Sequence, residues 1–229
     1  MAQSVVASRG RECGGVVNAR TVFERIFATM PLVAILRGVQ PDEVVSLADE
    51  LMEAGFKLIE VPLNSPHAFD SIGRLVAHCP ADVLVGAGTV LQPDDATRLG
   101  DQGARLMVTP NTDPAVIDAG RAAGLVPMVG CMTPSEALRA LSHGAAALKV
   151  FPANCLAPHF ARDLKAVLPD KVPIVAVGGI GKAEMAPYRA GGYDGFGFGG
   201  SLYAVGRKPS SVGSIARNLV KTWSDLVEG

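Results

Sequence analysis

The chain has 229 residues, of which 48% are hydrophobic and 19% charged, and its formal net charge is −1. A nearly neutral chain offers no basic surface for nucleic acid, and no apolar run approaches the roughly 18 residues that span a membrane. The length and the hydrophobic content indicate one globular domain with a sizeable core.

The cysteines and the N-terminal segment bear on the compartment. The four cysteines are far apart and show neither Cys-x-x-Cys nor metal-ligand spacing, so we expect free thiols in the reducing cytoplasm. The N-terminal segment has basic residues but no apolar stretch, which argues against a secretory signal. Residues 1–20 are small, polar and glycine-rich, and we interpret them as a loose tail, or as a start assigned too far upstream, before a single domain over 21–229.

Strand-like and helix-like segments alternate along the rest of the chain. A short helix over 21–29 is predicted first, with Val22, Ile26 and Phe27 facing inward. Apolar runs then predict eight strands, each followed by a helix. The predicted strands cover 32–36, 58–61, 83–89, 105–109, 126–131, 147–151, 174–177 and 193–198. The helices after them are expected at 43–53, 67–78, from 93 onward, 114–123, 133–143, 158–168, 183–190 and 211–227.

This order of elements indicates the fold class. Strands that are mostly unbroken apolar runs are typical of a parallel sheet covered on its outer face. Eight strand–helix units favour the α/β class and a closed (β/α)8 TIM barrel in a single domain. The alternative is an open, doubly wound sheet, which is disfavoured because the first strand–helix turn lacks G-x-G-x-x-G.

One lysine stands inside the sixth predicted strand, in the stretch 147–153. Burial among apolar neighbours lowers the pKa of an amine, because water no longer solvates the charged form. A neutral amine attacks a ketone or an aldehyde and forms a Schiff base. The alternative is that Lys149 lies at a strand end and extends its ammonium group to water.

Polar residues recur where the predicted strands end, which is the active-site end of such barrels. They are Arg37, Glu60, Thr89, Thr109, Asn111 and Lys149. Glu60 is isolated between apolar residues and needs a partner, which Lys149 or Arg37 could supply. The structural alternatives are a Glu60–Lys149 pair without catalytic function, a surface ion pair of Arg37 and a strand-end cap by Thr89.

Two glycine-rich loops follow the last two strands, at 178–179 and 199–201. Barrels often bind phosphate in these loops through backbone N–H groups, and glycine lets the backbone approach the anion. The four histidines fall in helices or turns without metal-ligand spacing, so we expect no metal and no cofactor. The residues alone therefore predict Schiff-base chemistry on a phosphorylated keto compound, with a carboxylate that moves protons.

Five segments together resemble the class I 2-keto-3-deoxy-6-phosphogluconate/galactonate aldolase family, in order from about Phe23 to Gly206. They cover 36–38, 59–66, 86–90, 109–113 and 148–153. The resemblance implies retro-aldol cleavage, without metal, of a phosphorylated keto-deoxy sugar acid to pyruvate and D-glyceraldehyde 3-phosphate. It also implies a homotrimer.

The same resemblance assigns roles to single residues. Lys149 would be the Schiff-base lysine, Glu60 the general acid/base, and Thr89 the ligand of the pyruvyl carboxylate. Other substrate contacts would come from Arg37, Asn64, Pro110, Phe151 and Val177. The phosphate would lie against Gly178, Gly179, Gly199, Gly200 and Ser201. The serine stands one place later than in relatives, so its hydroxyl need not reach the phosphate.

Two stretches distinguish the branches of this family. Val-Pro-Leu-Asn-Ser at 61–65 and Val-Gly-Gly at 177–179 resemble the galactonate branch. A gluconate aldolase, or one that accepts both C4 epimers, is the alternative. A more distant alternative is a phosphate-binding barrel isomerase or a non-catalytic sugar-phosphate binder, neither of which needs Lys149.

Overall fold

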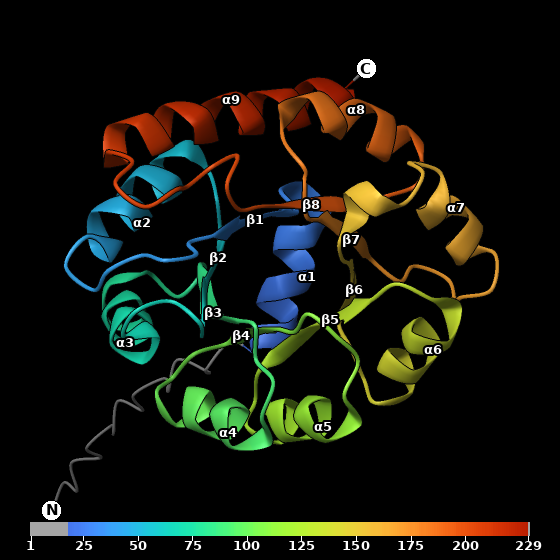
Figure 1. The fold of residues 1–229 in the computed structure, drawn as a ribbon, viewed down its shortest axis with the longest axis horizontal. Helices are drawn as coiled ribbons and strands as arrows, with labels where there is room; N and C mark the ends of the chain where they lie inside the picture. Colours follow the sequence, from blue (N-terminus) through green and yellow to red (C-terminus); the bar gives the residue numbers. More distant parts are fainter. Residues whose placement is uncertain (1–17, 229) are drawn as a thin grey trace, which may run out of the picture.

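Eight parallel strands close into one barrel, in which each strand pairs with the next and β8 pairs with β1 (Figure 1). The computed structural model describes residues 18–228. The strands are β1 Leu32–Ile35, β2 Leu58–Pro62, β3 Leu84–Gly88, β4 Leu106–Val108, β5 Val126–Cys131, β6 Ala147–Val150, β7 Ile174–Val177 and β8 Gly195–Phe198. The predicted α/β class and (β/α)8 barrel are confirmed, and the alternative of an open sheet is wrong.

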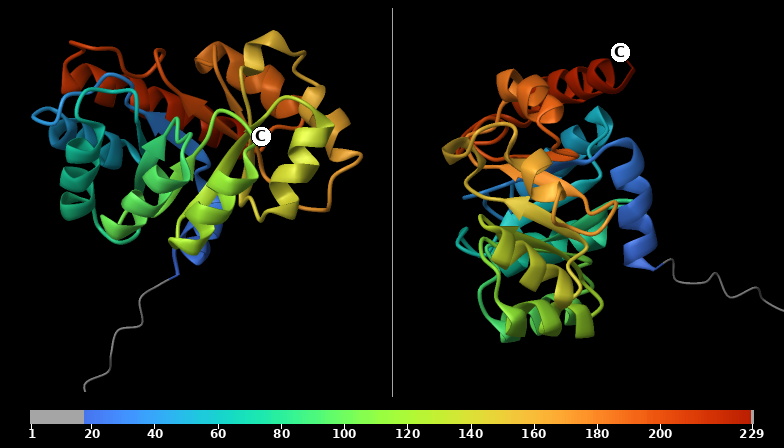
Figure 2. Two further views of the ribbon diagram at one scale, coloured as in Figure 1. Left: turned by 60° about the horizontal axis from the view of Figure 1, so that its bottom comes forward. Right: turned by 90° about the vertical axis from the view of Figure 1, so that its right-hand side faces the viewer.

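A ring of helices surrounds the barrel, and one helix follows each strand along the chain (Figures 1 and 2). They are α2 Val44–Ala54, α3 Ala68–His78, α4 Pro93–Asp101, α5 Pro114–Ala122, α6 Pro134–Ser142, α7 Phe160–Lys165, α8 Lys182–Ala190 and α9 Pro209–Glu228. Four of them begin with proline, whose missing N–H costs nothing at that position. Within residues 18–228, no helix is both long and apolar enough to cross a bilayer.

Helix α7 is shorter than the predicted 158–168. The residues after β6 form a 3-10 turn, Ala153–Cys155, and the α-helix starts only at Phe160. Past Lys165 the chain continues with i→i+3 hydrogen bonds, including one from the Val167 N–H to the Leu164 carbonyl at 3.1 Å. Pro169 comes two residues later and disfavours the α conformation at the residue before it. The last predicted turn is therefore present but wound more tightly than an α-helix.

Helix α1, Ala19–Thr29, lies across the end of the barrel where the strands begin (Figures 1 and 2). Val22, Phe23 and Ile26 are buried in a cluster that contains the first residues of β2 to β5. Phe27, expected to face inward, is only partly buried; its ring packs against that of Phe23 with centroids 4.6 Å apart. Helix α1 therefore closes the N-terminal end of the barrel and leaves the C-terminal end to the loops.

Much of the predicted loose tail, residues 1–17 with Cys13, lies outside the described residues. The described chain starts at Asn18, which caps α1 by accepting a hydrogen bond from the Arg20 N–H at 2.8 Å. The three other cysteines, Cys79, Cys131 and Cys155, are free thiols, as predicted.

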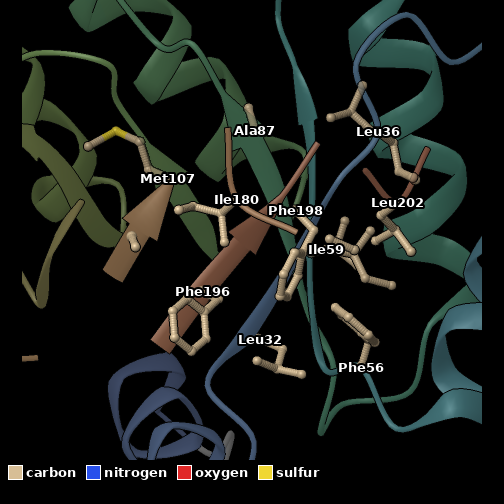
Figure 3. Packing of buried hydrophobic residues seen from close by; sticks show 14 of the residues in the cluster. Leu32, Leu36, Phe56, Ile59, Ala87, Met107, Ile180, Phe196, Phe198 and Leu202 are labelled. Atoms are coloured by element: carbon tan, nitrogen blue, oxygen red, sulfur yellow. The ribbon is translucent and has the colours of Figure 1, made fainter. Parts of the chain in front are cut away.

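The larger core fills the layer between the barrel and its helices, and Figure 3 shows part of it. Phe56 and Phe198 meet edge to face there, with ring centroids 6.4 Å apart. The Trp223 ring of α9 packs against Phe196 of β8 in the same way at 6.1 Å. Its indole N–H donates to the carbonyl of Thr29, the last residue of α1, at 3.0 Å. The last helix of the barrel is thus fastened to the first helix of the described chain.

Candidate active site

Two buried charged residues lie on strands of the barrel. Glu60 on β2 is 2% exposed and Lys149 on β6 is 4% exposed. The alternative in which the Lys149 ammonium extends to water is therefore wrong. The Lys149 Nζ lies 4.7 Å from the centroid of the Phe151 ring, close enough for a cation–π contact.

Glu60 and Lys149 each affect the pKa of the other. Burial raises the pKa of the Glu60 carboxyl from 4.5 to about 7, and the charges of Lys149 and Arg37 offset only part of that rise. Burial also lowers the pKa of the Lys149 amine, which the nearby Glu60 carboxylate opposes. A carboxyl group that titrates near neutrality can both donate and accept a proton, and a lowered amine pKa increases the nucleophilic fraction.

Gly88 of β3 provides the space for the Glu60 carboxyl group. A Cβ on residue 88 would overlap both carboxylate oxygens. The nearby Gly88 backbone also favours the charged carboxylate, which opposes part of the rise in its pKa. The Glu60 Oε2 atom has no hydrogen-bond partner among the described residues. A buried oxygen without a partner is unusual for a purely structural carboxylate, and it is free to exchange a proton with a ligand.

Arg37 connects three loops at the C-terminal end of the barrel. Its guanidinium donates to the Asn64 side chain at 3.0 Å and to the Thr89 hydroxyl at 3.5 Å. Both partners are neutral, so the predicted alternative of a surface ion pair has no support. Thr89 has φ 55°, a left-handed conformation that is rare for a β-branched residue. Such strain concentrates at functional sites, and here it places the threonine hydroxyl beside Arg37.

Thr109 and Asn111 have a structural role in the loop after β4. The Thr109 hydroxyl donates to the Asn111 carbonyl at 2.6 Å and accepts from the Gly130 N–H at 3.1 Å. Gly130 is the register partner of Lys149, and a Cβ there would overlap the backbone of Pro110. Pro110 therefore closes against β5 directly beside the lysine.

A pocket of about 480 Å³ lies at the ends of β7 and β8. Its lining includes most of the residues that the sequence predicted for phosphate and substrate. They are Ile35, Arg37, Phe151, Val177, Gly178, Gly179, Ile180, Gly181, Glu184, Gly197, Gly199, Gly200 and Ser201. Lys149, Glu60, Thr89, Asn64 and Pro110 do not line it. Arg37 and Phe151 connect the two groups of residues, because Arg37 bonds to Asn64 and Thr89 and Phe151 contacts Lys149.

The glycine loop after β8 presents backbone N–H groups at this pocket. The Gly199 carbonyl accepts hydrogen bonds from the N–H groups of Leu202 and Tyr203, at 2.8 and 2.9 Å. The N–H groups of Gly200 and Ser201 come before these first donors, as in the open first turn of a helix. The Ser201 hydroxyl donates to the Ile180 carbonyl at 2.7 Å, so it links the two loops.

Sequence reasoning missed several residues of the site. Ile35 and Gly197 line the pocket from β1 and β8, and Glu184 lines it from α8. The Glu184 carboxylate accepts from the Gly181 N–H at 2.8 Å, which caps α8. Gly88 could have been suspected, because a glycine inside a strand often marks a close approach. Within residues 18–228, no group of three His, Cys, Asp or Glu side chains is placed to hold a metal ion.

The sequence matches the family described as "Aldolase: KDPG and KHG aldolase" over residues 23–206. A probable 2-dehydro-3-deoxy-6-phosphogalactonate aldolase from Rhizobium meliloti (strain 1021) is 46% identical, over 84% of this chain and 89% of that protein. The 2-dehydro-3-deoxy-6-phosphogalactonate aldolase of Escherichia coli (strain K12) is 39% identical, over 87% and 97%. A solved structure described as "Native KDPGal structure" has a TM-score of 0.85 at 38% identity, over 87% and 97% of the two chains. These matches confirm the resemblance predicted from the sequence.

Proposed function

The chain belongs to the KDPG and KHG aldolase family, and on that premise we propose that it cleaves 2-dehydro-3-deoxy-6-phosphogalactonate to pyruvate and D-glyceraldehyde 3-phosphate. The observation that carries the proposal is the buried Lys149 amine, which shares the barrel interior with Glu60. A pocket that could hold a phosphate lies at the ends of β7 and β8, and Phe151, which contacts Lys149, lines it. The protein is thus a lyase in which the Schiff base forms on Lys149.

In the first step, the neutral Lys149 amine attacks the C2 keto carbon of the substrate. The resulting carbinolamine loses water when the Glu60 carboxyl group donates a proton to the departing hydroxyl. The product is an iminium ion on Lys149 and a carboxylate at Glu60. The lowered pKa of Lys149 and the raised pKa of Glu60 both supply the protonation states that this step requires.

In the second step, the C3–C4 bond breaks. The Glu60 carboxylate accepts the proton of the C4 hydroxyl, and C4 becomes the aldehyde carbon of glyceraldehyde 3-phosphate. The electron pair of the broken bond moves into the iminium ion and leaves an enamine. Glu60 then returns its proton to C3, and water hydrolyses the iminium ion to pyruvate and the free amine. One carboxyl group with a pKa near 7 serves every proton transfer.

The two ends of the substrate carry charge, and two sets of groups are placed to hold them. Arg37 and Thr89 are joined by a hydrogen bond and would bind the carboxylate of the pyruvyl end. The N–H groups of Gly200 and Ser201 would bind the phosphate. A Cβ on Gly199 or Gly200 would meet nothing within 4 Å, and neither has a left-handed φ. The fold alone therefore does not require these glycines, which supports a ligand that approaches the backbone there.

Val177 supports the galactonate epimer. It ends β7, is 5% exposed and lines the pocket next to Gly178. Its methyl groups face Gly197, where a Cβ would stand 2.8 Å from the Val177 Cγ2. Val177 has no hydroxyl to hydrogen-bond the C4 oxygen, so it gives no support to the gluconate configuration. A coupled assay of pyruvate release with both C4 epimers tests this assignment. Strong preference for the gluconate acid would contradict it.

We also propose that the protein is a cytoplasmic homotrimer. The side chains of Leu91, Met132 and Leu138 are 46%, 36% and 45% exposed, and exposed apolar groups favour a subunit contact that buries them. Light scattering on the purified full chain measures the assembly mass. A monomer or a dimer would contradict the trimer.

A further inference from the structure

A partly buried hydrogen bond joins the loop after β8 to the loop after β1. The Tyr203 hydroxyl donates to the Glu43 Oε1 atom at 2.7 Å, and the backbone N–H of Gln40 donates to the same oxygen at 3.0 Å. Tyr203 is only 2% exposed and Glu43 is half-buried, and a hydrogen bond to a carboxylate is stronger than one between neutral groups. Glu43 therefore holds its own loop and the β8 loop together.

On one side, Tyr203 belongs to the turn that forms the phosphate loop, residues 199–201. Its N–H and that of Leu202 both donate to the Gly199 carbonyl. In a trans peptide the N–H points opposite to the C=O, so the Gly200 N–H points away from this turn. Arg207 holds the Leu202 carbonyl at 2.7 Å. The direction of the phosphate-binding N–H groups thus depends on how the turn is anchored.

On the other side, Glu43 closes the loop that carries Arg37. The Leu36 N–H donates to the Glu60 carbonyl at 3.0 Å, and the Gly38 N–H donates to the Ser65 hydroxyl at 2.9 Å. Arg37 is held between these two anchored neighbours. The two loops also touch, because a Cβ on Gly38 would stand 2.8 Å from the Val205 Cγ2.

The apolar residues beside these loops are packed into one core. Leu36 precedes Arg37 and Leu202 precedes Tyr203, and both leucines are fully buried in the larger core between the barrel and its helices (Figure 3). Their burial limits how far either loop can move as a whole. The Tyr203–Glu43 hydrogen bond then limits how far the two loops above that core can move relative to each other.

We propose that Tyr203 and Glu43 are positioning residues that set the distance between the phosphate loop and Arg37, and so between the binding sites for the two ends of the substrate. The inference rests on the proposed function. Neither residue lines the pocket, so they act through the backbone and not by touching the substrate. The two residues stabilise the phosphorylated substrate equally in its ground state and in its transition state. Their loss should therefore raise KM and leave kcat unchanged.

The test uses Tyr203→Phe in the full chain. Loss of one hydrogen bond to a charged group should raise the KM for the phosphorylated acid about tenfold, while kcat stays as in the wild type. Pyruvate has no phosphate, so the rate at which borohydride traps it on the enzyme should not change. Tyr193→Phe is the matched control, because the buried Tyr193 hydroxyl has no partner among the described residues. Its KM should equal that of the wild type.

Variants of Glu43 provide a second test of the same hydrogen bond. Glu43→Ala should raise KM as Tyr203→Phe does, and the double variant should be no worse than either single one. Glu43→Gln keeps an acceptor oxygen for the tyrosine, so it should restore most of the affinity that Glu43→Ala loses. If Tyr203→Phe does not fold, the Glu43 variants decide the question, since Glu43 is only partly buried.

Several outcomes would overturn the inference. An unchanged KM in Tyr203→Phe and in Glu43→Ala would do so, as would a loss of pyruvate trapping equal to the loss of affinity, which indicates general loosening. A wild-type protein that neither releases pyruvate nor is trapped with it would overturn the proposed function, and this inference with it. An active wild type with unaffected variants would overturn the inference alone.

Discussion

The carboxyl group of Glu60 lies against the backbone of Gly88, in space that any larger residue at position 88 would occupy. The two residues are on neighbouring strands, two positions apart in register, since Glu60 pairs with Gly86 and Pro62 pairs with Gly88. The position of the Glu60 carboxyl group therefore requires the absence of a side chain at this point of β3.

Gly88→Ala should displace the Glu60 carboxyl group. Overpacking costs about 1–3 kcal/mol in the free energy of unfolding, and kcat should fall because the carboxyl group no longer reaches the reacting atoms. Thermal unfolding and steady-state kinetics measure the two effects. Gly73→Ala on α3 is the control, because its Cβ would meet only a Gln102 side chain at 3.4 Å, and it should keep full activity. A fully active Gly88→Ala enzyme would refute this role of Gly88.

Lys149 should be the residue that forms the covalent intermediate. Incubation with pyruvate and borohydride should add one reduced pyruvyl group, which peptide mass spectrometry locates. Lys149→Met should remain folded, because methionine fills the apolar space, and should form no adduct. Lys182→Met is the control, since Lys182 starts α8 beside the pocket but is exposed. An adduct on Lys182 or on Lys57 would exclude the assignment.

Glu60→Gln should retain the shape of the side chain and lose its ability to move protons. General acid–base catalysis contributes about 10²–10⁴-fold, so kcat should fall within that range. Borohydride trapping of pyruvate should also slow, because in the proposed mechanism Glu60 donates a proton to the departing hydroxyl of the carbinolamine. Turnover at the wild-type rate would show that another group, or water alone, carries the proton.

The same variant should change how stability depends on pH. The pKa of Glu60 is raised from 4.5 to about 7 in the folded protein, so the folded state binds the proton more tightly than the unfolded one. The stability that this provides is complete below pH 4.5 and is lost as pH rises through 7, by on the order of 3 kcal/mol. Chemical denaturation of wild type and Glu60→Gln from pH 4 to 8 should show that decline only in the wild type. Parallel curves would contradict the raised pKa.

Val177→Thr should shift the preference between the C4 epimers. The added hydroxyl can hydrogen-bond the C4 oxygen of the gluconate acid, which is worth up to roughly tenfold in kcat/KM. Val177→Ala changes the size of the side chain without adding a donor, so it should not favour the gluconate acid. The ratio of kcat/KM for the two epimers is measured for all three proteins. The same ratio in Val177→Thr as in the wild type would remove Val177 from epimer selection.

The barrel could be predicted from the sequence because its signals are local. Each strand is a short apolar run and each helix has a proline start or a regular apolar spacing, so the order of elements follows from neighbours in the chain. Lys149 was found for the same reason, as a charge inside an apolar run. The shortened α7 shows the limit of this reasoning, because the turn after β6 uses residues that also suit a helix.

The parts of the site that were missed depend on distant contacts. Gly88 matters only because Glu60 comes from another strand, and Ile35 is part of the pocket only because the barrel closes β1 against β8. Ser201 was predicted to hold phosphate, but its hydroxyl is bonded to the Ile180 carbonyl, which no spacing in the sequence reveals. The register of neighbouring strands and the closure of the barrel bring these residues together.

The hydrogen bond between the Trp223 indole and the Thr29 carbonyl makes the fluorescence of Trp223 a probe of folding. Trp223 is the single tryptophan of the chain, and its indole contacts the first described helix and the last strand at once. Its fluorescence therefore changes when α9 leaves the barrel, whichever end of the chain detaches first. The fluorescence of Trp223 during refolding would report when α9 docks and the barrel closes. The circular dichroism signal would report separately when the helices form.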